Sequence, residues 1–151
     1  MTYAIAIWLA ISGLAGAGSA AEKSLPLKDL PAAVQKTVQD TLKGGEIKNI
    51  GKEVEKGVSQ YEVESMLNGK HRDFNVDSQG KLLVVEEETS IDTIPAAARA
   101  AIMKKVGAGQ LGMVETFTKP GTETMFEAAW TTKAGKKHEV LVKADGTETK
   151  D

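Results

Sequence analysis

Two histidines are the side chains in this sequence that most readily bind a metal ion, and each one begins a strand-like run. His71 precedes a run in which Phe74 should face inward, so the period of two places His71 on the opposite, solvated face. His138 instead shares the phase of Val140. A bis-histidine site requires both imidazoles on one surface. The phase therefore favours two unrelated histidines, and we expect no metal ligands.

A calcium-loop pattern covers residues 75–86. Asn75, Asp77 and Gln79 place side-chain oxygens at loop positions 1, 3 and 5, with Gly80 at position 6 and Glu86 at position 12, as in an EF-hand. However, amides replace two of the usual carboxylates, and both flanks alternate in the manner of strands. Asp-x-x-Gly is also a common turn, because Asp bonds its own backbone and glycine tolerates positive φ. We expect the turn, and calcium binding is the alternative.

The sequence offers no residue that we can assign to catalysis. It contains no cysteine, no Gly-x-Ser-x-Gly pattern and no Ser-x-x-Lys at the start of a predicted helix. The formal net charge is −2 and aromatic residues make up 5% of the chain, which argues against nucleic acid and against an extended stacking surface. We therefore expect a non-enzyme without a cofactor.

Two clusters of like charge remain to be interpreted. The glutamates at 86–88 are most simply a solvated strand end that discourages edge pairing. Lys133, Lys136 and Lys137 surround a predicted hairpin and are either solvated surface or a docking site for a protein or peptide. Trp130, in the adjoining strand, is a core residue if its phase points inward and an interface hot spot if it is exposed. We assign Trp130, Lys133, Lys136 and Lys137 as the candidate partner-binding residues.

The first 21 residues have the features of a secretory signal peptide. They carry no charged side chain, and an apolar run gives way to small residues that end at Ala20-Ala21. No Lys or Arg precedes the apolar run, and an uncleaved membrane anchor is the alternative. The run is short for a membrane span and is interrupted by glycines. We expect cleavage near Ala20-Ala21 and a secreted or periplasmic mature chain that does not span a membrane.

The elements that must position these residues follow one scheme twice. Leu30-Pro31-Ala32-Ala33 opens one half, and Ile94-Pro95-Ala96-Ala97 opens the other. A helix-like run of about three turns follows each opening. Strand-like runs come next, at 46–55, 59–67, 70–76 and 81–86 in the first half and at 110–118, 124–131, 136–143 and 147–150 in the second.

This pattern predicts an α+β protein made of two tandem repeats, each with one helix packed on a three- to four-stranded antiparallel sheet. The repeats should cover residues 25–90 and 91–151, after the signal peptide at 1–21. Because a unit of about 60 residues buries little core by itself, we expect the two halves to pack together or to share one sheet. The first core should contain the inward-facing apolar residues of the helix and the central strands: Val34, Val38, Leu42, Tyr61, Val63, Phe74 and Val76.

The motifs of the first half resemble those of the PepSY-like proteins, a group similar to beta-lactamase inhibitor protein. They are a helix start at residues 30–34, the Tyr61-Glu62-Val63 strand, the Asn68-Gly69-Lys70 hairpin and the Phe-x-x-Asp-x-x-Gly turn at residues 74–80. The second half keeps Ile94-Pro95 and the end of the turn motif at residues 140–146, and it has Phe126-Glu127-Ala128 in place of the central strand. The resemblance implies an exported, non-catalytic domain proposed to bind or inhibit a peptidase or another extracytoplasmic enzyme.

The sequence therefore predicts an exported binding module that inhibits or modulates an extracytoplasmic enzyme such as a peptidase. The alternative is a small calcium- or metal-responsive envelope protein or a hydrolase. A binding module would act through a sheet face or an edge, with a protein or peptide as its partner.

Overall fold

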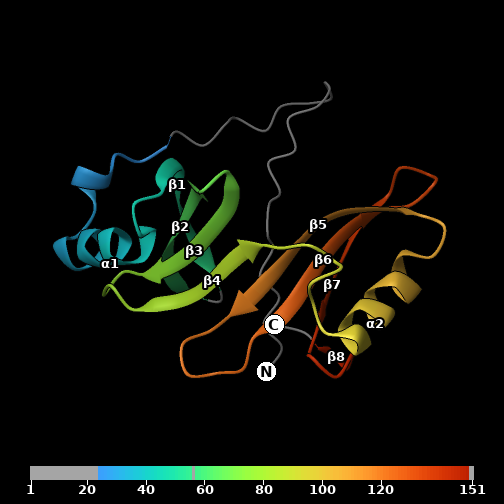
Figure 1. Ribbon diagram of the computed structural model, residues 1–151. Helices are drawn as coiled ribbons and strands as arrows, with labels where there is room; N and C mark the ends of the chain where they lie inside the picture. The colour runs from blue at the N-terminus through green and yellow to red at the C-terminus, as the bar shows by residue number, and fades with distance from the viewer. Residues whose placement is uncertain (1–23, 56, 150–151) are drawn as a thin grey trace.

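A computed structural model of the chain describes residues 24–55 and 57–149 (Figure 1). The predicted signal peptide lies outside these residues. The elements, in chain order, are η1 (Leu27–Asp29), α1 (Ala32–Leu42), β1 (Glu46–Glu55), β2 (Val58–Leu67), β3 (Lys70–Asp77), β4 (Leu82–Glu88), α2 (Ala96–Val106), β5 (Gln110–Thr118), β6 (Met125–Thr131), β7 (Lys137–Val142) and β8 (Glu148–Thr149). The predicted strands are confirmed, with bounds that agree within two residues.

The predicted arrangement of two tandem repeats, each with a helix on its own three- to four-stranded sheet, is wrong. All eight strands belong to one antiparallel sheet in the order β1 to β8. The joint between its two parts is the pairing of β4 with β5, in which Val85 lies opposite Thr118 and Glu88 lies opposite Glu115. Strands β4 and β5 pair because each would otherwise leave a row of unpaired backbone groups at an edge.

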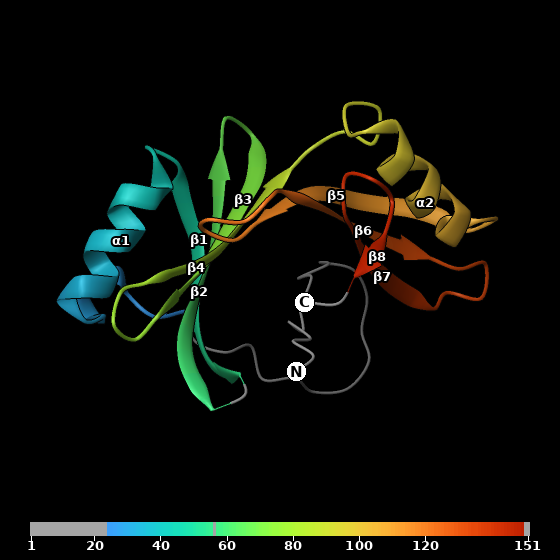
Figure 2. The same cartoon turned by 90° about the horizontal axis from the view of Figure 1, so that it is seen from below.

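Both helices lie on the same side of this sheet. Figure 2 shows the sheet curved, with α1 and α2 on the outer side of the curve. The strand register agrees, because Glu87 of β4 lies opposite Arg72 of β3 and opposite Thr116 of β5. Arg72 has the same strand phase as Phe74 of the α1 core, and Thr116 has the same phase as Val114 of the α2 core. Both cores therefore lie on one face of the sheet. The other face of the sheet carries neither helix.

The apolar core lies between the helices and the sheet. Around α1 it contains Val34 and Val38 together with Tyr61, Val63, Phe74 and Val76, which confirms those predicted core residues. Leu42 is partly buried and packs against the same cluster. Around α2 the cluster contains residues of the helix and of three strands: Ala98, Ile102, Val106, Val114, Phe126, Ala128, Trp130, Val140 and Val142.

Two glycine turns attach the helices to the sheet. Gly80, in the turn between β3 and β4, has φ +85°, and a Cβ there would lie 2.7 Å from the backbone of Ala33 in α1. The Thr37 hydroxyl of α1 donates a hydrogen bond of 2.5 Å to the Gly80 carbonyl. Gly146 makes the corresponding approach to Ala97 of α2, also at 2.7 Å. These turns need glycine for a positive φ and for the close approach of a helix.

In the part of the chain that the structure describes, no helix is long and apolar enough to cross a membrane.

Candidate functional site

The sheet face opposite the helices gathers acidic side chains from several strands. We call it the open face, and define it by the residues whose side chains alternate with the core positions: Gln60, Glu62, Glu64, Asp73, Asn75, Val84, Glu86, Glu88, Glu115, Phe117, Met125, Glu127, Ala129, Glu139 and Leu141. Eight of these residues are acidic. Strand alternation explains their position, since successive residues of a strand point to opposite faces of the sheet.

The register places carboxylates directly across from one another on this face. Glu86 of β4 lies opposite Asp73 of β3. Glu115 of β5 lies between Glu88 of β4 and Glu127 of β6. Like charges directly opposite each other in a sheet are destabilising, so these pairs are costly to the fold unless a proton or a cation accompanies them.

Two of these glutamates are buried. Glu86 is 7% exposed and Glu115 is 6% exposed. In the described part of the chain, neither carboxyl forms a hydrogen bond or an ion pair. Burial of a carboxylate without a partner disfavours its charged form. The prediction that the glutamates at 86–88 are a solvated strand end is therefore wrong for Glu86, whereas Glu87 is exposed and Glu88 is half-buried.

The pKa values of this acidic group reflect burial and mutual repulsion. Burial raises the pKa of Glu86 to about 9, and the same effect comes from the charges of four neighbours: Glu127, Glu115, Asp73 and Glu62. Burial also raises the pKa of Glu115 to about 7, with further contributions from Asp73, Glu88 and Glu139. The pKa of Asp73 is raised by burial as well, although a hydrogen bond from the Ser65 amide opposes the shift. Near neutral pH this face therefore holds protons.

An apolar cluster lies beside the carboxylates on the same face. Val84 and Phe117 are 1% exposed and Leu141 is 8% exposed, with Met125 packed against them. Lys119 lies with its Nζ 5.6 Å from the centre of the Phe117 ring. The open face thus combines an apolar cluster, of which the half-buried Met125 is accessible, with adjoining acidic groups. This is the composition of a site for a side chain that is apolar along its stem and cationic at its tip.

The calcium-loop interpretation of residues 75–86 is not supported. The segment is a β-hairpin formed by β3 and β4, without the flanking helices of an EF-hand. The Asp77 carboxylate accepts hydrogen bonds from the backbone N–H groups of Gln79 and Lys81, as the turn interpretation predicts. Among the described residues, no group of three or more His, Cys, Asp or Glu side chains is placed to hold a metal ion.

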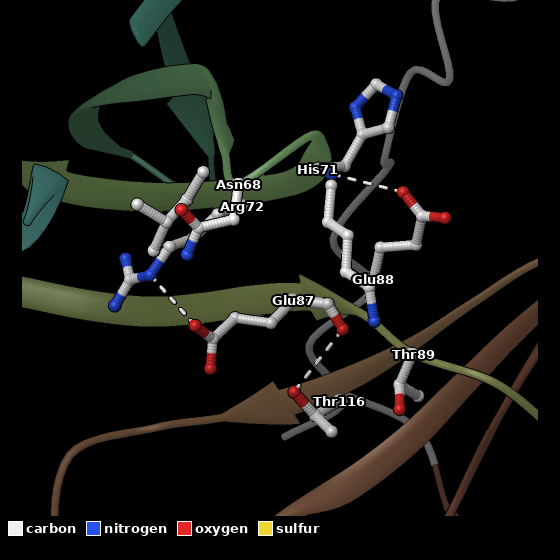
Figure 3. A pocket seen from close by; sticks show the side chains of 9 residues that line it. Asn68, His71, Arg72, Glu87, Glu88, Thr89 and Thr116 are labelled. Atoms are coloured by element: carbon white, nitrogen blue, oxygen red, sulfur yellow. Dashed lines mark hydrogen bonds and ion pairs between the residues drawn. The ribbon is translucent and has the colours of Figure 1, made fainter. Parts of the chain in front are cut away.

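A cavity of about 450 Å³ opens where β3, β4 and β5 meet (Figure 3). Arg72 projects toward it, but its guanidinium is 5% exposed and already paired. The Arg72 Nε donates to Glu87 at 2.9 Å, and Nη1 donates to the Thr41 carbonyl at the end of α1, also at 2.9 Å. A cation there also interacts favourably with the helix dipole. Arg72 therefore holds α1 against the sheet and is not free to bind a ligand.

The predicted partner-binding residues lie at the β6–β7 hairpin and at the edge of the α2 core. Lys133, Lys136 and Lys137 are all exposed. Trp130 is 9% exposed and belongs to the α2 core. Its ring stacks on His138, with 5.2 Å between ring centres and 18° between planes. The structure thus leaves the three lysines, but not the indole, at the surface.

The two histidines lie apart in the fold. His71 is exposed on β3, and its backbone N–H donates to the Glu88 carboxylate at 3.1 Å. His138 is half-buried against Trp130 on the helix side of β7. The phase argument placed both correctly.

Sequence reasoning missed the buried pair formed by Glu86 and Glu115. A signal was present, because Glu115 shares its strand phase with Phe117 while Val114 occupies the other phase. A strand with large apolar residues in both phases is buried on both faces, so a glutamate within it is buried too. The proximity of Glu86 depends on the β4–β5 pairing, which leaves no pattern in the local sequence.

Comparison with known proteins gives structural neighbours only. No family model matches the chain, and no curated protein matches it. A BLIP-like protein from Bacteroides fragilis superposes with a TM-score of 0.58 at 23% identity, over 82% of this chain and 84% of that protein. A DUF2874 family protein from Bacteroides uniformis superposes with a TM-score of 0.62 at 16% identity, over 78% and 85% of the two chains.

A third structure, described as a candidate periplasmic protein from Bacteroides eggerthii, has a TM-score of 0.64 at 16% identity and covers 79% of this chain and 85% of its own. At these identities the likeness concerns the fold and not the residues of a site. The chain therefore has a fold similar to that of the BLIP-like and DUF2874 proteins.

Proposed function

We propose that this protein is an exported, non-catalytic binding module that inhibits or modulates an extracytoplasmic enzyme such as a peptidase, and that it contacts this partner through the open face. The observation that carries the proposal is the asymmetry of the sheet. Both helices cover one face, and the other face carries eight acidic residues together with the half-buried Met125 and Ala129.

The composition of the open face supports binding over structure alone. A face that served only as solvated surface would carry polar residues alone, but this one also carries the half-buried Met125 and Ala129 beside the buried Phe117 and Leu141. A mixed apolar and polar surface on a rigid sheet is typical of protein interfaces. The fold neighbours support the location and class of function, since one is described as BLIP-like and another as periplasmic.

A steric block of the open face tests the proposal. Ala129 is half-buried on β6 and points to this face, so Ala129→Trp adds bulk without charge. Ala100 is exposed on α2, on the outer side of the sheet, and Ala100→Trp is the matched control. A partner captured by the wild-type protein from an extracytoplasmic extract should bind Ala129→Trp about tenfold more weakly or worse, and Ala100→Trp unchanged. Equal binding of both variants at equal melting temperature would reject the open face as the contact.

The β6–β7 hairpin is a second contact surface that we retain as part of this proposal. Its exposed lysines would accelerate association with an acidic region of the same partner, since surface charge acts mainly on the association rate. Lys136→Glu combined with Lys137→Glu should slow association, most clearly at low salt, and leave the melting temperature nearly unchanged. Lys28→Glu with Lys104→Glu, both at exposed positions, is the control. Unchanged association kinetics in the hairpin variant would make the lysines ordinary solvated surface.

A further inference from the structure

The open face holds two buried acids, and among the described residues neither forms an ion pair. Glu86 and Glu115 are diagonal neighbours on adjacent strands. Glu86 lies opposite Phe117, and Glu115 is two residues away on the same face, opposite Glu88. Each is more than nine-tenths buried and lacks a hydrogen-bond or ion-pair partner among the described residues. A buried carboxylate is normally paired or hydrogen-bonded, because desolvation of an unpaired charge is costly. An unpaired buried acid is thus a position where a ligand can supply what the fold does not.

The groups that face this pair have mostly the same charge. Glu62 and Asp73 approach from β2 and β3, Glu88 is on β4, Glu127 is on β6 and Glu139 is on β7. Three cationic groups lie on or beside this face. Lys119 lies over the Phe117 ring, Lys143 lies 4.0 Å from Glu123, and His71 is exposed at the end of β3. The local field therefore attracts a cation to the centre of the face.

The shape of the surroundings indicates which cation fits. The described carboxylates do not converge as metal ligands do. Met125 is half-buried at the accessible part of the adjoining apolar cluster, and a small hydrated ion would leave its apolar surface uncovered. A lysine or arginine side chain matches both parts, because its methylene stem packs on apolar surface while its tip pairs with carboxylates.

We propose that the open face recognises a lysine or arginine of its protein partner, which places its cationic tip between Glu86 and Glu115 and its stem on Met125. This inference rests on the proposed function and names the chemistry of the partner. Arrival of the cation favours the ionised carboxyls, so binding releases protons and becomes tighter as pH rises.

Hexa-arginine peptide is a suitable probe, because its guanidinium groups stay charged throughout the range. Titration calorimetry of the purified protein at pH 6 and pH 8, in two buffers of different ionisation enthalpy, measures affinity and proton release together. The test variant is Glu86→Gln with Glu115→Gln, and the control is Asp40→Asn with Glu148→Gln, which removes two exposed carboxylates on the helix side of the sheet. A His71→Gln background removes the imidazole at the margin of the face.

We expect the wild-type protein to bind the peptide more tightly at pH 8 with proton release, and the test variant to bind about tenfold more weakly without proton release. The control should bind like the wild type. Absence of binding to the wild type, or equal weakening in the test variant and the control, overturns the proposal. The two proposals fail separately: if Ala129→Trp blocks the natural partner but the test variant binds the peptide normally, the open face is the contact and the cationic anchor is wrong.

Discussion

The protonation of Glu86 and Glu115 links the chemistry of single residues to the stability of the whole fold. Both carboxyls have folded-state pKa values above the ordinary 4.5, at about 9 and about 7. Between pH 4.5 and these folded-state pKa values, the folded state binds more protons than the unfolded state. The contribution to stability is fully present below pH 4.5 and is lost as pH rises through the folded-state values.

The unfolding free energy should therefore fall as pH rises from about 5 to about 9, by about 1.4 kcal/mol per pH unit for each proton by which the two states differ. Glu86→Gln with Glu115→Gln should flatten this slope and raise stability at pH 8, because glutamine keeps the shape without an ionisable group. Urea titrations at pH 5, 7 and 9 measure the effect. A slope as steep in the variant as in the wild type would place the responsible groups elsewhere.

At the scale of the elements, the turn between β3 and β4 both reverses the chain and contacts α1. The Asp77 side chain closes the turn, and Gly80 lets the turn approach α1. The sequence predicts the turn correctly from its residue types. It does not predict the contact with α1, because a tertiary approach leaves no sign in the turn itself.

Gly80→Ala tests this contact against the conformational preference of glycine. Gly80 and Gly121 have nearly equal φ angles, +85° and +80°, but only a Cβ at Gly80 would meet another segment, at 2.7 Å from Ala33. Gly121→Ala should cost about 1 kcal/mol for the strained φ alone. Gly80→Ala should cost about 1–3 kcal/mol more, because the clash with the backbone of α1 forces a shift. Chemical denaturation of both variants measures the loss in unfolding free energy. Equal losses would show that α1 moves away from the added Cβ without a cost in stability.

At the scale of the whole molecule, the sequence predicts the elements well and their assembly poorly. Strand phase places Phe74, Val76 and Tyr61 in the core correctly, because burial on one face imposes a period of two. The small core of each half predicts that the halves pack together or share one sheet, but the sequence pattern does not decide between the two. The β4–β5 pair joins strands separated by α2, and its register, from Val85 opposite Thr118 to Glu88 opposite Glu115, depends on backbone pairing between two edges. The same pairing creates the buried acidic pair, so the candidate site was as hard to predict as the joint.

A continuous sheet should make the two cores unfold together, and one substitution can test this. Tyr61 is 6% exposed in the α1 core, and Tyr61→Ala should lower the unfolding free energy by about 3–5 kcal/mol, as for other buried aromatic residues. Trp130 lies in the α2 core, and in a Trp8→Phe background it is the only tryptophan of the chain. If the β4–β5 joint couples the cores, Tyr61→Ala shifts the unfolding midpoint of Trp130 fluorescence as much as the midpoint of the far-ultraviolet circular dichroism. An unshifted Trp130 transition would show that the α2 core unfolds on its own, with the joint too weak to transmit the loss.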